Sequence, residues 1–164
     1  ERLRFNLEYH NEARFDFCTI LVGYNDGLWN IPPDQFESDL ESLVRRALSC
    51  SDYVYLLNMK DLKKMPSITG IPWIVEKLYS NMPIWKYADR YQAKMNKVVS
   101  RFSEPRLQVV NVRDLWYYTG ETDLTFDGLH PNIAGYNKIA KLILKKIEEN
   151  EDLMSRLKIS KVVI

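Results

Sequence analysis

Apolar residues gather in short runs along the chain, and longer stretches with helical spacing lie between these runs. Residues 15–22, 53–57 and 107–112 are nearly continuous apolar runs, a pattern typical of strands covered on both faces. Helical spacing predicts three amphipathic helices, one of them over residues 84–102. We therefore expect an α/β fold, a three-layer α/β/α arrangement in which the three strands are parallel neighbours. The apolar positions of the helices are Phe36, Leu40, Leu43, Val44 and Leu48, then Tyr87, Tyr91, Met95, Val98 and Val99, then Ile133, Tyr136, Ile139, Ala140, Ile143, Leu144 and Ile147.

The two ends of the chain are less regular than its middle. Near the start, Leu3, Phe5, Leu7 and Tyr9 alternate with polar residues, which fits an amphipathic edge strand better than a helix. Residues 157–164 are rich in β-branched residues, and an apolar strand in that place is expected to pair with another segment. No repeat and no linker rich in Pro, Gly or Ser divides the chain, so we expect residues 1–164 to form a single domain.

Composition and charge exclude several function classes. The chain has 46% hydrophobic residues, which is enough for a substantial core. Its 23 basic and 22 acidic residues are spread over helical surfaces, so we expect no nucleic-acid partner. No apolar run is long enough for a transmembrane segment, and no targeting signal is present in this chain.

The two cysteines do not form a disulfide framework. Cys18 lies in an apolar strand and Cys50 at the end of a helical pattern, which favours two buried free thiols over one disulfide. No Cys or His cluster has the spacing of metal ligands, so we expect neither a metal nor another cofactor.

One motif with candidate chemistry opens the last predicted helix. Asp127 and His130 are three residues apart, and Gly128 between them can adopt a positive φ, so both side chains can point the same way. This spacing suits a carboxylate that orients an imidazole. Pro131 fits the first position of the helix, where its missing N–H costs nothing. Taken alone, the pair is more often a turn residue and a histidine at a helix entry.

A second motif follows the first apolar run. Asn25, on a tight turn after Gly23, can direct its carboxamide N–H toward a developing oxyanion. Asp26 is expected to accept backbone N–H groups and hold the turn. By itself, Gly-Tyr-Asn-Asp at residues 23–26 is an ordinary turn signal.

Together the two motifs resemble the third and fifth sequence blocks of the SGNH, or GDSL, serine ester hydrolases. The match at residues 127–140 reads Asp-Gly-Leu-His-Pro-Asn-x-x-Gly-Tyr-x-x-Ile-Ala, and residues 58–66 are similar to the Asn-x-x-Asp-Leu-x-x-x-Pro loop of lipolytic members. The resemblance implies an SGNH-hydrolase-like, flavodoxin-like topology. It also implies that His130 is the general base, that Asp127 orients it and that Asn25 is an oxyanion donor. Gly23, Tyr24 and Trp29 would flank the substrate, whereas Trp73, Trp85 and Trp116 are better interpreted as core aromatics.

The chain departs from the family pattern where the nucleophile should be. It contains no Gly-Asp dipeptide, and its serines lack a strand-then-turn setting, with Ser67 the least unsuitable. We expect the N-terminal strand, the nucleophile and the second-block Gly to lie on a preceding segment or on a companion chain. The chain would then be the C-terminal part of an SGNH-like hydrolase domain and inactive in isolation.

Three functions remain open at this stage. The first is a GDSL lipase or esterase, phospholipase-like, that cleaves acyl or lipid esters; such a protein would be secreted or lumenal. The second is a non-catalytic SGNH-like binding or scaffolding module. The third is an assembly with rearranged strand order, because residues 158–164 resemble the strand that precedes the nucleophile.

Overall fold

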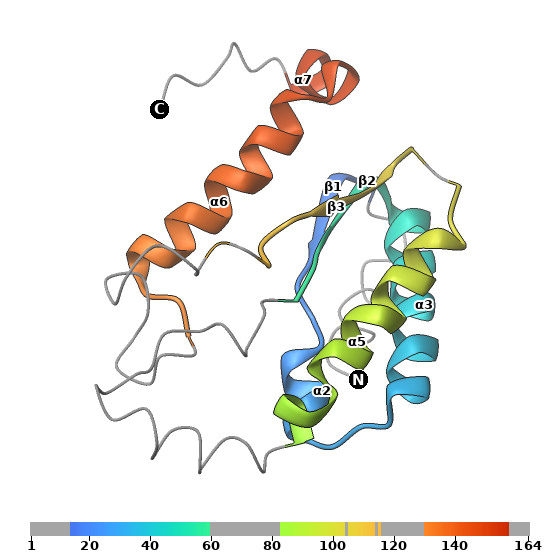
Figure 1. Ribbon diagram of the computed structural model, residues 1–164. Helices are drawn as coiled ribbons and strands as arrows, with labels where there is room; N and C mark the ends of the chain where they lie inside the picture. Colours follow the sequence, from blue (N-terminus) through green and yellow to red (C-terminus); the bar gives the residue numbers. More distant parts are fainter. Residues whose placement is uncertain (1–13, 60–82, 104, 114, 116–129, 158–164) are drawn as a thin grey trace.

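The computed structural model describes residues 14–59, 83–103, 105–113, 115 and 130–157 of the chain, with the backbone alone for residues 83–87. Strands and helices alternate along these residues (Figure 1). The elements are β1 (Phe15–Ile20), α2 (Tyr24–Leu28), α3 (Pro33–Cys50), β2 (Ser51–Leu57), α5 (Pro83–Ser100), β3 (Leu107–Val110), α6 (Ile133–Glu148) and α7 (Glu151–Leu157).

The described strands form one parallel sheet in the order β1-β2-β3. Phe17 pairs with Tyr53 in the first ladder, and Leu56 pairs with Val109 in the second. The prediction that the three strands are parallel neighbours is therefore confirmed. β2 begins two residues earlier than expected, and β1 and β3 each end two residues earlier.

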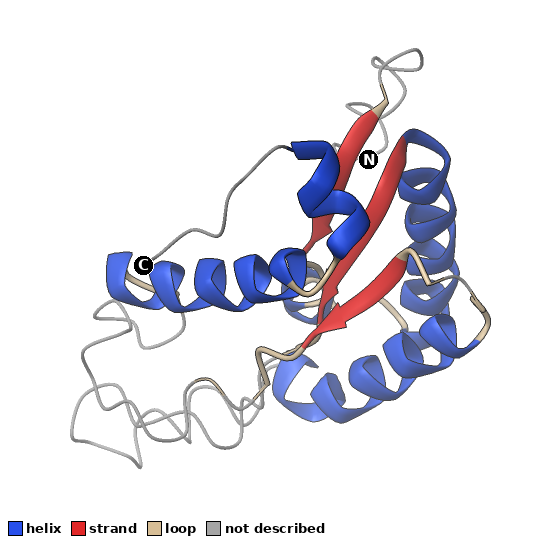
Figure 2. Cartoon of the chain, turned by 90° about the horizontal axis from the view of Figure 1, so that it is seen from above, coloured by secondary structure: helices blue, strands red, loops and turns tan. Residues whose placement is uncertain are grey.

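Helices α3 and α5 cover one face of this sheet (Figure 2). Phe36 and Tyr91 are both essentially buried, and their rings meet edge to face with 5.0 Å between centroids. Val44 and Leu56 lie in the same cluster. The predicted apolar positions of α3 are buried here, except Leu43, which is partly buried.

Helices α6 and α7 cover the other face. Tyr55 and Leu57 of β2 form a second buried cluster with Val110, Ile139 and Leu153. Both faces of the sheet thus carry helices, and the expected three-layer α/β/α arrangement is confirmed (Figure 2).

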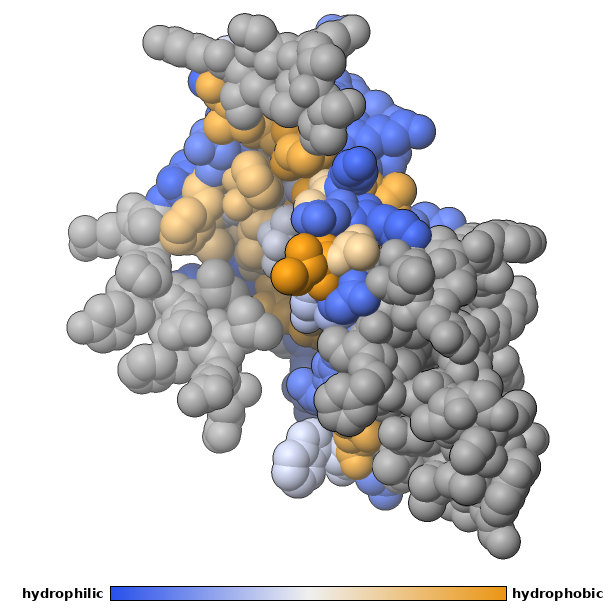
Figure 3. Space-filling view, turned by 90° about the vertical axis from the view of Figure 1, so that its left-hand side faces the viewer, coloured by the Kyte–Doolittle hydropathy of each residue, from blue (hydrophilic) through white to orange (hydrophobic). Residues whose placement is uncertain are grey.

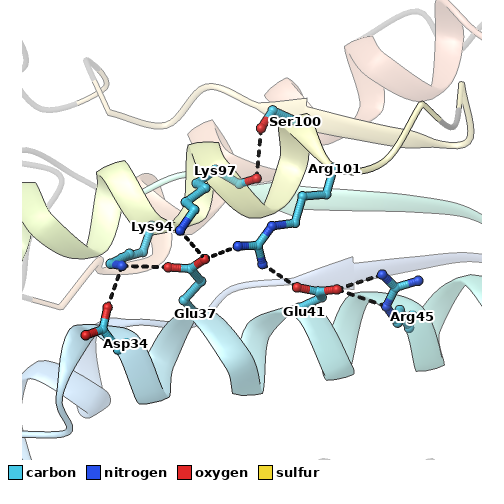
Figure 4. Close-up of polar contacts among 8 residues, drawn as sticks. All are labelled: Asp34, Glu37, Glu41, Arg45, Lys94, Lys97, Ser100 and Arg101. Atoms are coloured by element: carbon cyan, nitrogen blue, oxygen red, sulfur yellow. Dashed lines mark hydrogen bonds and ion pairs between the residues drawn. The ribbon is translucent and has the colours of Figure 1, made fainter.

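Ion pairs join α3 to α5 along the outer edge of their contact (Figure 4). Glu37 is central, because Lys94 contacts its Oε2 at 2.6 Å and Lys97 its Oε1 at 2.9 Å, while Arg101 bridges Glu37 and Glu41. The hydrogen bonds from Lys94 and then Lys97 hold the pKa of Glu37 at about 2, well below its ordinary value of 4.5.

β1 differs from the expectation of a strand covered on both faces. Phe15, Phe17 and Leu21 are 41%, 37% and 48% exposed. The prediction is wrong here. A continuous apolar run indicates only that a strand is able to pack on both faces, and the neighbouring elements decide whether both faces are in fact covered. β1 is an edge of the described sheet, and α6 and α7 pack on β2 and β3 instead.

The start of α6 also differs from the expectation. Helix α6 begins at Ile133, so Pro131 does not occupy its first position; the Asn132 side chain caps the helix by accepting the Gly135 N–H at 3.1 Å. Three predicted buried positions of α6 are exposed, with Ile133 at 82%, Tyr136 at 57%, and Ala140. The apolar surface of α6 is therefore wider than the described sheet covers.

Cys18 and Cys50 are free thiols, as the sequence favoured, but only Cys50 is buried, whereas Cys18 is partly buried. Among the residues that the structure describes, no helix combines the length and apolar character needed to cross a membrane. Several predictions lie outside the described residues: those on residues 3–9, on the loop after residue 59, on Ser67, Trp73, Trp116 and the Trp85 side chain, and on residues 158–164.

Candidate active site

The turn that follows β1 is built around Gly23. Its φ of 108° lies in the left-handed region, which a residue with a side chain rarely adopts. Its N–H donates to the Asp26 Oδ2 at 3.1 Å, as expected for Asp26, and its carbonyl accepts the Gly27 N–H at 3.1 Å. A side chain on Gly23 would also meet Met59, whose sulfur lies 2.9 Å from the ideal Cβ position. Only glycine fits this position without strain.

Tyr91 of α5 bonds to the chain at the turn, and Gln92 of α5 bonds to Met59, which lies beside it. The Tyr91 hydroxyl donates to the Ile31 carbonyl, just after α2, and lies 3.5 Å from the Asp26 carbonyl. The Met59 N–H donates to the Gln92 Oε1 at 3.0 Å. The helical spacing predicted Tyr91 as a core residue, but it carried no sign that the hydroxyl reaches this turn. The Tyr91 bond attaches the turn to α5, and the Gln92 bond attaches Met59, against which Gly23 packs, to the same helix.

The predicted polar and aromatic residues of this turn differ in exposure. Asn25 lies on the exposed side of α2, and within the described residues its carboxamide has no hydrogen bond. Tyr24 is half-buried and packs against the core beneath α3 and α5. Trp29 is 80% exposed at the end of α2, so it is not a core aromatic. Asn25 is therefore available to a ligand.

His130 lies just before α6, with its side chain exposed. Its expected partner Asp127 lies outside the described residues, so the hydrogen bond between the two stays a prediction. The Asn132 cap fixes the start of the helix next to His130.

The direction of α6 shows on which side of the sheet His130 lies relative to Asn25. The Asp152 carboxylate, in α7, accepts the Tyr53 hydroxyl at 2.7 Å, which places α7 near the start of β2. An α6 helix of 16 residues is about 24 Å long. Figure 1 shows it running from the side where the strands end toward the side where they begin. The start of α6 and the turn after β1 thus lie toward the carboxyl ends of the strands, where parallel sheets collect reactive groups.

Asn58, at the carboxyl end of β2, has a structural role at this edge. Its Oδ1 accepts the Val112 N–H at 2.8 Å and the Arg113 N–H at 3.1 Å, and its Nδ2 donates to the Asn111 Oδ1 at 2.9 Å. The residue is 9% exposed and ties the end of β2 to the chain after β3. The sequence pattern placed Asn58 in a lipolytic loop motif and did not indicate these bonds.

The described serines do not follow the carboxyl end of a strand directly. Ser51 opens β2 and donates to the Ala47 carbonyl at 2.6 Å, and it is fully buried. Four others donate to helix carbonyls or sit within α3 and α5, while Ser103 follows α5 and Ser155 lies in α7. Among the described residues, no group of three His, Cys, Asp or Glu side chains could hold a metal ion.

Comparison with solved structures shows a similar fold. The chain superposes on the crystal structure of LAE5, an alpha/beta hydrolase enzyme from the metagenome of Lake Arreo, Spain, with a TM-score of 0.55 and 21% sequence identity. The superposition covers 79% of this chain and 58% of that one, so the chain spans less than two thirds of the length of that protein. No curated protein matches the chain.

Comparison with protein families shows where the chain belongs. Residues 1–138 match the family described as GDSL-like lipase/acylhydrolase. The matched residues include both motifs, the Gly23 turn and the His130 segment, and far more than half of the sequence. The chain therefore belongs to the GDSL-like lipase/acylhydrolase family.

Proposed function

We propose that this chain is part of a serine ester hydrolase that cleaves acyl or lipid esters. The observation that carries the proposal is the position of Asn25 and His130. Asn25 follows β1 and His130 precedes α6, and both lie toward the carboxyl edge of one parallel sheet in a chain of the GDSL-like family. The α/β hydrolase similarity supports the fold in which this chemistry would take place.

Each residue would have a defined role in the reaction. His130 takes the proton of the nucleophile and returns it to the leaving group, and Asp127 fixes its tautomer and stabilises the imidazolium. The carboxamide N–H of Asn25 donates to the oxyanion of the tetrahedral intermediate, which typically stabilises the transition state by roughly 3 kcal/mol. Gly23 and Tyr24 hold Asn25 in position, and Trp29 offers an exposed apolar surface to the acyl group.

The nucleophilic serine would come from a preceding segment or a companion chain. The absence of a Gly-Asp dipeptide in the sequence supports this, as do the helical positions of most described serines. The same observation favours a second candidate function, a non-catalytic binding or scaffolding module with the same fold.

Hydrolysis of a chromogenic short-chain ester separates these candidates. We expect turnover only when the chain is joined to, or mixed with, the segment that carries the nucleophile. His130→Ala should abolish that turnover, whereas His10→Ala, at the other histidine of the chain, should leave it unchanged. Absence of turnover in the complete protein would support the non-catalytic module. Robust His130-dependent turnover of the 164-residue chain alone would identify a nucleophile within it, and Ser67→Ala would be the first variant to test.

A further inference from the structure

Helix α6 carries an apolar stripe that the described sheet does not cover. Ile133 and Tyr136 are 82% and 57% exposed, and Ala140, which follows at helical spacing, is exposed as well. Ile139 of the same helix is buried in the cluster that contains Tyr55 of β2. The helix therefore packs one apolar side on the sheet and presents a second one to the solvent.

The same helix is basic. The chain between residues 130 and 147 has no acidic residue and four lysines, Lys138, Lys141, Lys145 and Lys146, although the formal net charge of the whole chain is only +1. Lys141 and Lys145 are exposed. Lys141 lies about 80° around the helix from Ile133, so positive charge and the apolar stripe share the exposed side. Figure 3 shows hydrophobic and hydrophilic residues next to each other on the side of the molecule that carries α6.

The charge changes sign along the axis of α6. The end of α6 and the start of α7 carry four acidic residues, Glu148, Glu149, Glu151 and Asp152. An anionic surface therefore attracts the lysine-bearing turns of α6 and repels its far end. The helix would approach such a surface with its start nearest, and this is where Ile133 and Tyr136 are exposed.

Two further apolar side chains are exposed toward the carboxyl edge of the sheet. Leu28 and Trp29, at the end of α2, are 48% and 80% exposed. Tryptophan and tyrosine are frequent at the boundary between lipid headgroups and acyl chains, because each combines an apolar ring with a polar N–H or O–H. The start of α6 and the end of α2 thus give this edge of the molecule apolar contacts of the kind that a lipid surface accepts.

We propose that the start of α6 docks on an anionic lipid surface, with Ile133 and Tyr136 inserted below the headgroups and Lys141 beside them. Basic amphipathic helices with an exposed apolar stripe bind such surfaces through apolar burial and charge together. A nucleic acid would use the lysines but not the stripe. A second copy that paired through the same face would bring two basic helices together, so the charge favours lipid over both alternatives.

Docking at this face gives the candidate active site a substrate class. This consequence rests on the proposed ester hydrolysis, whereas the docking itself does not. His130 lies three residues before α6, so docking brings the proposed base to the lipid surface. The substrate would then be an ester of a membrane lipid, which reaches the site from the bilayer.

Co-sedimentation of the 164-residue protein with vesicles tests the docking surface. We expect binding to vesicles of phosphatidylcholine mixed with phosphatidylglycerol to be at least about tenfold tighter than binding to phosphatidylcholine alone, and high salt should reduce this difference. Ile133→Thr combined with Tyr136→Thr should weaken binding to the mixed vesicles by at least about tenfold, because the inserted apolar surface is lost. Lys141→Gln should weaken it by about fivefold.

Matched controls change similar residues elsewhere on the surface. Val109→Thr replaces a β-branched apolar residue at a 37% exposed position of β3, and Arg90→Gln removes an exposed cation from α5. Both variants should bind the mixed vesicles like the wild type. Because every substituted position is exposed, circular dichroism should show the wild-type fold in all of these proteins.

Four results would overturn the docking surface. One is equal binding to the two kinds of vesicle, or no binding to either. A second is wild-type binding in both α6 variants, which would assign the interaction to another surface. A third is a loss in Lys141→Gln but none in the paired threonine variant, which would leave charge alone as the cause. The fourth is self-association without lipid that the α6 substitutions abolish, measured by sedimentation velocity, which would assign the stripe to a second copy.

The docking surface and the proposed hydrolase can fail separately. Vesicle binding that depends on Ile133, Tyr136 and Lys141, in a complete protein that hydrolyses no ester, would support the docking surface and contradict the hydrolase. Ester hydrolysis that depends on His130, in a protein that does not bind the mixed vesicles, would support the hydrolase and overturn the docking surface.

Discussion

The sulfur of Met59 lies 2.9 Å from the point where a Cβ of Gly23 would stand. Met59 follows β2 and is fully buried, while Gly23 follows β1, so the two strand ends meet at this contact. The turn that carries Asn25 therefore packs directly against the buried Met59 side chain. Its position depends on the absence of a side chain at Gly23.

Gly23→Ala is expected to destabilise the protein by about 1–3 kcal/mol. The substitution combines a φ of 108°, which is strained for alanine, with a contact that is too close to Met59. Urea unfolding of the variant measures the change. In a double-mutant cycle, Met59→Ala should relieve the steric part alone, giving a favourable coupling with Gly23→Ala. Additive effects of the two substitutions would contradict the steric contribution.

Tyr91→Phe is expected to lower the free energy of unfolding by about 1–2 kcal/mol. The variant keeps the ring contact with Phe36 but leaves the Ile31 carbonyl without its donor in a partly buried place. Tyr53→Phe removes a hydroxyl from an exposed bond to Asp152 and serves as the matched control, with a smaller effect. Equal losses in the two variants would show that the Tyr91 hydroxyl does not support the turn.

Acid should weaken the contact between α3 and α5 through Glu37. The pKa of Glu37 is about 2 in the folded protein and ordinarily 4.5, so its ionised form is favoured by folding. A lowered pKa contributes stability above the unfolded value, and this contribution is lost as the pH falls from about 4.5 toward 2. Unfolding measured over this range should therefore show a steeper loss in the wild type than in Glu37→Gln.

A second carboxylate provides the control for this pH dependence. Lys146 lowers the pKa of Glu149, but the side chains of Lys146 and Glu149 are 37% and 47% exposed, against 9% for Glu37. Exposed pairs contribute little, so Glu149→Gln should leave the acid profile close to that of the wild type. A Glu37→Gln profile that also follows the wild type would show that the network around Lys94 and Arg101 does not stabilise the fold.

Asn25→Ala is expected to lower the turnover of the complete hydrolase by about 10²- to 10³-fold. The side chain is exposed, so its removal should leave the melting temperature unchanged. Asn137→Ala, at an exposed position of α6, is the matched control and should leave turnover unchanged. Ester kinetics on both variants measure the difference, and a loss below about threefold for Asn25→Ala would remove Asn25 from the oxyanion site.

Local sequence patterns were sufficient for the order and direction of the main elements. The runs at residues 15–22, 53–57 and 107–112 coincide with the three parallel strands, apart from the first two residues of β2, and the helix predicted over residues 84–102 is α5. The glycine and aspartate of the first motif also predicted the turn in which Asp26 accepts the Gly23 N–H. These features depend on backbone preferences and on periodicity. Both are set by residues that are close in the sequence and do not require the rest of the fold.

The start of α6 shows where local preferences compete with each other. Pro131 suits the first position of a helix, and Asn132 suits the cap, and the two cannot both begin the same helix. The cap prevails because the Asn132 side chain satisfies the Gly135 N–H, a donor that the helix itself leaves unpaired. The sequence analysis placed the start at Pro131, and the hydrogen bond from the Gly135 N–H places the cap at Asn132 instead.

By itself, the sequence determined which residues are apolar, at what period, and where the glycine turn falls. Only the tertiary structure decided which of those apolar residues are covered: Val54 is fully buried in β2, whereas Phe17 is exposed in the adjacent strand. It also decided that the Tyr91 hydroxyl reaches Ile31 and that Glu37 meets Lys94. Periodicity reports the character of a face, whereas burial, hydrogen-bond partners and pKa depend on elements that pack there from distant parts of the chain.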